Sequence, residues 1–238
     1  MIFSLASVFA QNTSQDIVLD SIQKLDEVII RANTILGNKF AAQNRTGASY
    51  FLSTEDLEQF GYADINRALR TVPGVNMYEE DGYGLRPNIS LRGTSPQRSS
   101  KITLMEDSVL IAPAPYSSPA AYYFPSVLRM QAIEILKGSS QVQHGPFTTG
   151  GAINLVSTAI PNDFSAKIRS SYGSFNTTQL HTSIGQSFEK TGYMLEYLNY
   201  NSDGFKRLGD KENTGFDIYD IVGKLRFSTN VDAKLSQS

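Results

Sequence analysis

The two histidines, His144 and His181, are the side chains in this chain best suited to acid–base or metal chemistry. Neither has a carboxylate or a second histidine at a spacing typical of a ligand set or a proton relay. The serines lack a paired base, and H-E-x-x-H, G-x-S-x-G and phosphate-loop motifs are absent. The chain has no cysteine, which excludes disulfides and thiolate metal sites. The sequence therefore predicts neither an enzyme nor a cofactor or metal held by the protein.

The amino-acid composition narrows the possible classes of protein further. The chain has 238 residues, 40% of them hydrophobic, and a formal net charge of −2, which is typical of a globular protein. Lys and Arg together number 21 against 23 acidic residues, so no basic field exists to bind nucleic acid. No apolar run approaches the roughly 18 residues that a membrane-spanning helix needs.

The segment Arg129–Thr158 combines strands with unusually tight turns. It predicts one strand at 131–136 and another at 151–157. Between them, Gly145-Pro146 and Gly150-Gly151 fix the backbone, because glycine adopts positive φ and proline restricts φ. Taken alone, this segment is compatible with an ordinary loop of an α/β domain.

Three motifs in sequence order make the pattern more specific. They are Ile89-Ser90-Leu91-Arg92-Gly93, Leu104-Met105-Glu106-Asp107-Ser108, and Ile133-Glu134-Ile135-Leu136-Lys137-Gly138 followed by His144-Gly145-Pro146 and Gly150-Gly151-Ala152-Ile153-Asn154. These motifs resemble the plug domain of TonB-dependent outer-membrane receptors, and the resemblance covers roughly residues 25–238. Ser108 stands where the family usually has glycine, so the turn there could be of another type.

The residues between these motifs predict short helices and strands. Ser53 and the acids after it begin one helix. A second helix begins near Asp64 and carries an apolar stripe, and Pro73-Gly74 ends it. Strands are expected at 75–78 and 89–91, with a hairpin across 106–108. The predicted fold class is an α+β plug domain, a small mixed sheet with short helices, followed by the first antiparallel strands of a transmembrane β-barrel.

Four segments after Pro161 have the alternation of strands: 164–173, 177–188, 192–202 and 217–228. In the last, Tyr219, Ile221 and Leu225 share one face, opposite Asp220 and Lys224. Alternating strands of about ten residues are typical of outer-membrane barrels, although soluble antiparallel sheets alternate too. The short turn at 174–176 and the long loop at 203–216 are interpreted as a periplasmic turn and an external loop. Because a barrel needs at least about eight strands, the chain is expected to be an N-terminal fragment of a receptor.

The N-terminal residues predict export and a flexible arm. Residues 1–10 are similar to the second half of a signal peptide, and 11–32 form a polar arm. The expected organisation is then a plug domain at 33–161 and about four barrel strands at 162–238. A β-branched run on the arm favours extended backbone that could add to a partner's sheet, or could be the first strand of the domain. The resemblance implies that this run is the TonB box: Asp26, Glu27, Val28, Ile29, Ile30, Arg31 and Ala32.

The resemblance also implies roles for charged and aromatic residues. Arg92, Glu134 and Lys137 would lock the plug to the barrel wall, whereas the residues alone favour solvated edge charges. The loops at 94–100 and 112–124 would form the outward-facing apices. The implied ligand-binding residues are Arg86, Gln97, Arg98, Tyr116, Tyr122 and Tyr123, with guanidinium groups suited to an anionic carboxylate ligand.

The function that the resemblance implies is TonB-dependent uptake of a ferric chelate, a siderophore or ferric citrate, across the outer membrane of a Gram-negative bacterium. Ferric dicitrate-type transporters are the most similar members. The implied partners are TonB with its inner-membrane energising complex, the ferric chelate and outer-membrane lipid, with plug and box facing the periplasm. Ferric iron would enter only as part of the transported chelate. The alternative is a non-transporting, plug-like module that binds a ligand or signals.

Overall fold

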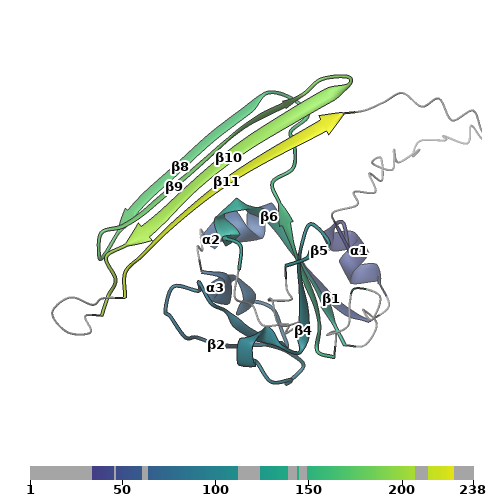
Figure 1. Cartoon of the computed structure of the whole chain (residues 1–238). Helices are drawn as coiled ribbons and strands as arrows, with labels where there is room; N and C mark the ends of the chain where they lie inside the picture. Colours follow the sequence, from purple (N-terminus) through teal and green to yellow (C-terminus); the bar gives the residue numbers. More distant parts are fainter. Residues whose placement is uncertain are drawn as a thin grey trace, which may run out of the picture. The chain divides into compact units, whose positions relative to one another are not determined.

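A computed structural model describes residues 34–45, 47–60, 64–111, 124–138, 144, 149–206 and 214–227 (Figure 1). Two sets of elements follow each other along the chain, which we call the plug region and the wall sheet. The plug region consists of α1 (Lys39–Asn44), β1 (Ala48–Leu52), α2 (Thr54–Phe60), α3 (Ile65–Leu69), β2 (Val75–Tyr78), β3 (Asn88–Leu91), η1 (Gln97–Ser99), β4 (Ile102–Glu106), β5 (Val109–Leu110), η2 (Val127–Arg129), β6 (Met130–Lys137) and β7 (Gly151–Ser157). The wall sheet consists of β8 (Ser165–Gly173), β9 (Thr177–Ser187), β10 (Thr191–Ser202) and β11 (Phe216–Phe227).

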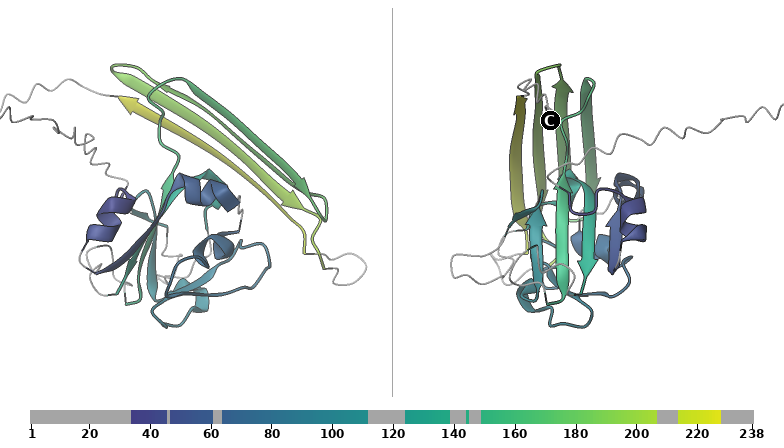
Figure 2. Two further views of the ribbon diagram at one scale, coloured as in Figure 1. Left: turned by 180° about the vertical axis from the view of Figure 1, so that it is seen from behind. Right: turned by 90° about the vertical axis from the view of Figure 1, so that its right-hand side faces the viewer.

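The plug region is built on a five-stranded mixed sheet in the order β1-β6-β7-β4-β5. β4 pairs with β7 in parallel, and the other neighbours are antiparallel. α1 lies on one side of this sheet, and α2 and α3 lie on the other (Figures 1 and 2). β6 and β7 are buried along nearly their whole length, which explains why both segments are almost continuously apolar. A second, two-stranded sheet pairs β2 with β3.

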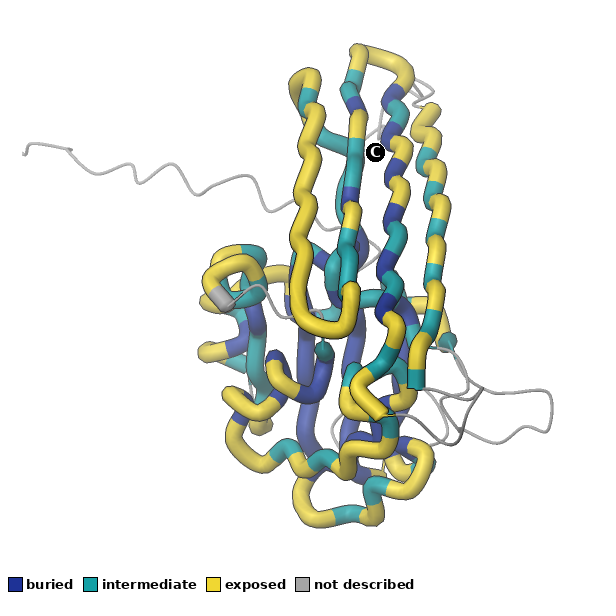
Figure 3. Tube along the Cα trace, turned by 90° about the vertical axis from the view of Figure 1, so that its left-hand side faces the viewer, coloured by how far each residue is buried: buried dark blue, intermediate teal, exposed yellow. Residues whose placement is uncertain are grey.

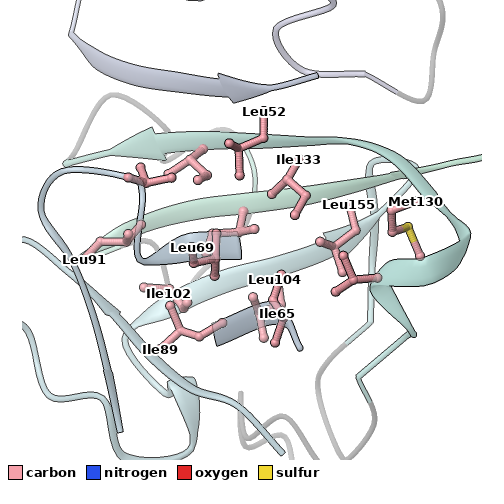
Figure 4. Close-up of a cluster of buried hydrophobic side chains, with 14 residues drawn as sticks. Leu52, Ile65, Leu69, Ile89, Leu91, Ile102, Leu104, Met130, Ile133 and Leu155 are labelled. Atoms are coloured by element: carbon pink, nitrogen blue, oxygen red, sulfur yellow. The ribbon is translucent and has the colours of Figure 1, made fainter. Parts of the chain in front are cut away.

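The main core of the plug region fills the space between the sheet and α3 (Figure 4). Leu69 and Ile133 are fully buried there, and the apolar stripe predicted for the second helix faces this core as expected. A smaller cluster on the α1 side of the sheet contains Leu36, Ala42 and Leu136. Each face of the sheet therefore has its own apolar layer.

The wall sheet has the order β11-β10-β9-β8, with every pair antiparallel. Its residues alternate between buried and more exposed along β10, and between intermediate and exposed along β11 (Figure 3). Tyr219 and Ile221 on β11 are 74% and 66% exposed, whereas the polar residues Glu196 and His181 on the other face are buried together with apolar residues such as Leu198. A soluble sheet would normally leave polar rather than large apolar side chains on its exposed face.

The interpretation of the wall-sheet connections was wrong on one point. The turn at 174–176 and the loop at 203–216 were interpreted as a periplasmic turn and an external loop, on opposite sides, but the strand ends that they connect lie at the same end of the sheet. The amide of Asp203 donates to the carbonyl of Phe175 at 2.9 Å, and the rings of Phe175 and Phe205 are 6.4 Å apart. In an antiparallel meander the first and third connections share one end, so connection length alone was misleading. The opposite end carries the short turn at 188–190, where the Phe188 amide donates to Thr191.

The predicted elements agree with the structure, and four short ones were missed. The mixed sheet, the short helices and the four antiparallel strands confirm the predicted fold class. α1, β1 and the 3₁₀ helices η1 and η2 were not predicted. The hairpin between β4 and β5 turns at Asp107 and Ser108, whose φ values are 50° and 65°. Positive φ at both positions is typical of a type I′ turn, so serine keeps the backbone shape usually given to glycine. None of the helices in the described ranges is long and apolar enough to cross a membrane.

Asp64 links the start of α3 to a pH dependence of stability. Its Oδ1 accepts from the Asn66 amide at 2.8 Å and caps the helix, although the side chain is only 13% exposed. Burial raises the pKa of Asp64 above its ordinary value of 3.8, and the nearby charges of Glu79 and Asp81 act in the same direction. The folded protein therefore binds a proton more tightly than the unfolded chain. Stability from this group is fully present below the unfolded pKa and is lost as pH rises through the raised folded pKa.

We expect Asp64→Asn to be at least as stable as the natural protein at pH 7, because asparagine keeps the cap without a buried charge. Asp64→Ala loses the cap and should be less stable than Asp64→Asn by about 1 kcal/mol. The measurement is denaturant unfolding of the protein between pH 4 and pH 7. A natural protein that loses no stability relative to Asp64→Asn as pH rises would contradict the assignment.

Candidate functional site: the plug apex and its contacts with the wall sheet

Two of the predicted ligand residues, Gln97 and Arg98, line one hollow of about 480 Å³ at the end of the plug region. The buried side chain of Asn88 shapes it. Asn88 Oδ1 accepts from the Arg98 amide at 2.7 Å, and Asn88 Nδ2 donates to Glu80 at 3.1 Å. Arg98 has φ 51°, a left-handed conformation that this hydrogen bond helps to hold. The hollow thus combines a guanidinium, an amide and a phenol, Tyr78, on a fixed backbone.

Arg86, the third described ligand candidate, does not line this hollow and lies on the adjoining loop. One carboxylate, Asp81, organises that loop. Its Oδ1 accepts from the amides of Tyr83 at 2.8 Å and Gly84 at 2.7 Å, and its Oδ2 accepts from the Arg86 amide at 2.7 Å. The backbone that carries Arg86 is therefore held in one shape.

Tyr83 joins this loop to the wall sheet. Its hydroxyl lies 2.9 Å from the Ser202 hydroxyl, and its ring packs edge-on against Phe216 with centroids 4.7 Å apart. Phe205 adds a second ring contact at 5.6 Å. The loop with Arg86 thus meets the end of the wall sheet where the 203–215 connection begins. The remaining candidates, Tyr116, Tyr122 and Tyr123, lie outside the described residues, as does the predicted box from Asp26 to Ala32.

The three residues expected to lock plug to barrel have their described contacts inside the plug region. The Glu134 carboxylate accepts backbone amides from 35–37 and the Asn154 side chain. Lys137 donates to the Pro73 carbonyl and lies 5.7 Å from the centre of the Tyr50 ring. Burial lowers the pKa of Lys137, and the positive charge of Arg92 lowers it further. A role of this trio at the wall stays a prediction.

Arg129 makes a strong contact between the plug region and the wall sheet. Its two terminal guanidinium nitrogens donate to the two carboxylate oxygens of Glu106, and its Nε donates to Asp220 Oδ2 on β11 at 2.8 Å. The Arg129 side chain is only 3% exposed, whereas the two carboxylates keep a fifth to a quarter of their surface in water. Planar, two-pronged pairing of this kind fixes orientation as well as charge.

Lys224 on β11 makes a second polar contact. Its ammonium donates to Asp107 Oδ2 at 3.2 Å, to the Thr158 carbonyl at 2.8 Å and to the Ser157 hydroxyl. All three hydrogens of the ammonium thus have acceptors in the plug region or in the segment that follows it.

Glu196 on β10 makes the third contact. Its Oε1 accepts from the Thr158 hydroxyl at 3.0 Å and lies 2.7 Å from His181 Nε2. His181, which had no predicted role, is therefore part of the polar inner face. Sequence alternation had already placed Asp220 and Lys224 on the face opposite the apolar residues, but it could not supply their partners.

Comparison with known proteins agrees with this architecture. Residues 41–152 match the family described as TonB-dependent Receptor Plug Domain. The chain is 24% identical over 189 residues to the vitamin B12 transporter BtuB of Photobacterium profundum, covering 78% of this chain and 30% of that protein. It is 24% identical over 238 residues to the iron-regulated outer membrane virulence protein of Vibrio cholerae, covering 97% and 34%. The chain thus spans about a third of the length of these relatives.

Solved structures share the fold across both parts of the chain. The unliganded ferric citrate transporter FecA aligns with a TM-score of 0.68 and 24% identity, covering 81% of this chain and 30% of that chain. The ferric yersiniabactin uptake receptor FyuA of Yersinia pestis aligns with a TM-score of 0.64 and 20% identity, covering 79% and 30%. Together with the plug motifs, the family match identifies residues 41–152 as a TonB-dependent receptor plug domain, and the structural matches show that the chain shares the fold of such receptors.

Proposed function

We propose that this chain serves in TonB-dependent uptake of a ferric chelate, a siderophore or ferric citrate, across the outer membrane. The observation that carries the proposal is the joint between plug region and wall sheet. Arg129 and Lys224 cross it as charged groups with oxygen partners. Directional polar contacts of this kind can break and re-form in one defined register, which suits a plug that must move and return.

The substrate would meet the plug at its apex. Arg98 and Gln97 face the hollow, and Arg86 is presented on the neighbouring loop. Guanidinium groups bind carboxylates with two parallel hydrogen bonds, and many ferric chelates expose carboxylate or other anionic oxygens. The aromatic residues Tyr116, Tyr122 and Tyr123 are proposed to complete this surface. The relatives include a vitamin B12 transporter, so the arginines are the reason for preferring an anionic chelate.

The arm before the plug region would supply the energy input. In the proposed division, residues 1–10 are a signal remnant, 11–32 the arm, 33–161 the plug domain and 162–238 barrel strands. The run at 26–32 is β-branched and would pair as an added strand with TonB in the periplasm. A pull on this strand would be transmitted to the plug and would open its contacts with the wall.

The alternative is a plug-like module that binds a ligand or signals without transport. It would need the apex but not a lipid-facing sheet. The exposed apolar residues of β8–β11 favour transport, because a binding module in water would have no use for such a face. The two functions separate experimentally, since only transport requires the box.

We expect Arg129→Met to destabilise the folded receptor by about 3 kcal/mol, since it leaves two partly buried carboxylates without their partner. The matched control is Arg169→Met, which removes an exposed ion pair with Glu58 and should change stability by less than about 1 kcal/mol. Thermal or denaturant unfolding of the intact receptor measures both. Equal losses of unfolding free energy in the two variants would show that burial does not make the Arg129 contacts contribute more to stability.

For the ligand, we expect Arg98→Ala to weaken ferric citrate binding by about 10-fold or more, through loss of charge-assisted hydrogen bonds. Arg86→Ala should weaken binding too, while Arg70→Ala, an exposed arginine paired with Glu79, should not. Isothermal calorimetry on the intact receptor gives the constants. Unchanged affinity in both apex variants would remove these arginines from the site, and tighter binding of cobalamin than of ferric citrate would reject the substrate class.

For the energy input, deletion of residues 26–32 in the intact receptor should abolish energised uptake and leave ligand binding at the cell surface intact. Uptake of a radiolabelled ferric chelate by whole cells and binding by de-energised cells are the two measurements. Undiminished uptake by the deletion variant would mean that these residues are not the box.

A further inference from the structure

Glu134 is a fully buried carboxylate whose four hydrogen bonds go mainly to backbone far away in sequence. It lies on β6 with no exposed surface. Its Oε1 accepts from the amides of Leu36 at 2.9 Å and Gly37 at 2.7 Å. Its Oε2 accepts from the Ile35 amide at 2.7 Å and from Asn154 Nδ2 at 2.8 Å. Each oxygen therefore satisfies two donors.

The segment that Glu134 holds is neither helix nor strand. Residues 34–37 precede α1, and Gly37 has φ 82°, so these amides have no ladder of their own. Buried amides need partners, and a carboxylate that accepts several backbone N–H groups forms the stronger, charge-assisted kind. Leu36 of this segment packs in the small apolar cluster with Leu136, and the Glu134 side chain has no exposed surface. One side chain thus attaches this segment to β6, an inner strand of the plug sheet.

Hydrogen bonds, joined by one step along the backbone from Ser108 to Asp107, lead from Glu134 to the wall sheet. Asn154, the register partner of Glu134 on β7, accepts from the Ser108 amide through Oδ1 at 2.8 Å. Ser108 and Asp107 form the left-handed turn of the β4–β5 hairpin. Asp107 accepts from the Ser157 amide at 3.0 Å and from Lys224 of β11 at 3.2 Å.

We propose that Glu134 is a positioning residue that anchors the segment 35–37 and passes a pull on that segment, through Asn154 and the 107–108 turn, to the Lys224 contact at the wall. This rests on the proposed function, because the segment follows the predicted box by only a few residues. A pull on 35–37 acts on three hydrogen bonds at once, because the backbone amides of these residues all donate to the Glu134 carboxylate. The load then reaches β6 and β7 before any apolar core is exposed.

The chemistry of the anchor makes it testable with an isosteric change. Glu134→Gln replaces one oxygen by an NH₂ group. Whichever oxygen is replaced, two donors lose their acceptor and face another donor. Asn154→Ala interrupts the proposed path at a later step. It removes only one of the four donors to Glu134, but it takes away the acceptor of the Ser108 amide. Glu58→Gln, at an exposed ion pair, is the matched control for loss of a carboxylate.

The experiment is amide hydrogen exchange on the intact receptor, without substrate or TonB. In Glu134→Gln we expect the amides of 35–37 to exchange about 100-fold faster and that of Ser108 about 10-fold faster than in the natural protein. In Asn154→Ala we expect the Ser108 amide to accelerate while 35–37 keep their protection. In Glu58→Gln none of these amides should change.

Two results would overturn the proposal. Unchanged exchange at 35–37 in Glu134→Gln would show that the carboxylate does not hold the segment. Acceleration at 35–37 without any change at Ser108 would show that the coupling stops at the anchor. If Glu134→Gln does not fold, Glu134→Asp and Asn154→Ala carry the test, with partial loss of protection expected at 35–37 in the former.

This test also separates the inference from the proposed function. Exchange requires neither uptake nor ligand, so the anchor can be established even if deletion of 26–32 leaves uptake unchanged. In that case the anchor stands as a feature of the plug, and the role of the arm in uptake fails. Conversely, box-dependent uptake with unaltered exchange in Glu134→Gln would leave the function intact and reject the anchor.

Discussion

A charged group buried on the inner face of the wall sheet needs a partner inside the protein. In this chain β10 and β11 expose Tyr219 and Ile221, and on the opposite face Glu196 is buried beside apolar residues such as Leu198. The contacts with the plug region therefore include ion pairs and hydrogen bonds, from Arg129 and Lys224. Polar contacts of this kind are directional, so each fixes the plug region at a defined register against the strands.

The plug region depends on the same constraint in another form. β6 and β7 are buried on both faces, so any polar group they carry must find its partner within the protein. Glu134 and Asn154 satisfy each other and reach outward, one to the segment before α1 and the other to the β4–β5 turn. The apolar layers give the plug region its stability, while these two side chains determine which surface segments are attached to it.

The sequence predicts most of this fold because local signals and burial agree. The alternation of apolar and polar residues predicted the bounds of the four wall strands to within one or two residues. The acidic residues at the start of each helix predicted where α2 and α3 begin. The sequence did not predict α1 or β1, because Lys39–Asn44 has six residues without an apolar stripe and Ala48–Leu52 does not alternate clearly between apolar and polar residues. Both are held by tertiary contacts, such as the Ser49 hydroxyl donating to the Ala42 carbonyl.

The site was less accessible from the sequence, since charge pairing depends on which strands become neighbours. Alternation marked Asp220 and Lys224 as a polar face, but Arg129 could be matched to Asp220 only once β11 was placed. From the residues alone Glu134 was expected to be a solvated edge charge, which was wrong because the side chain is fully buried. Its described partners are mainly backbone amides close to the arm, which no spacing rule indicates. The apex residues Gln97 and Arg98 meet because Asn88 holds the loop.

The near-complete burial of Arg129 has a consequence for the surroundings in which such a joint works. Mobile ions screen charges that water reaches, and the Arg169–Glu58 pair, about half exposed, would weaken in brine. Arg129, at 3% exposure, lies largely beyond the reach of that screening. The part of the plug–wall free energy that Arg129 contributes should thus differ little between fresh and salt water, whereas the part contributed by Arg169 on β8 and Glu58 on α2 should fall as salt rises.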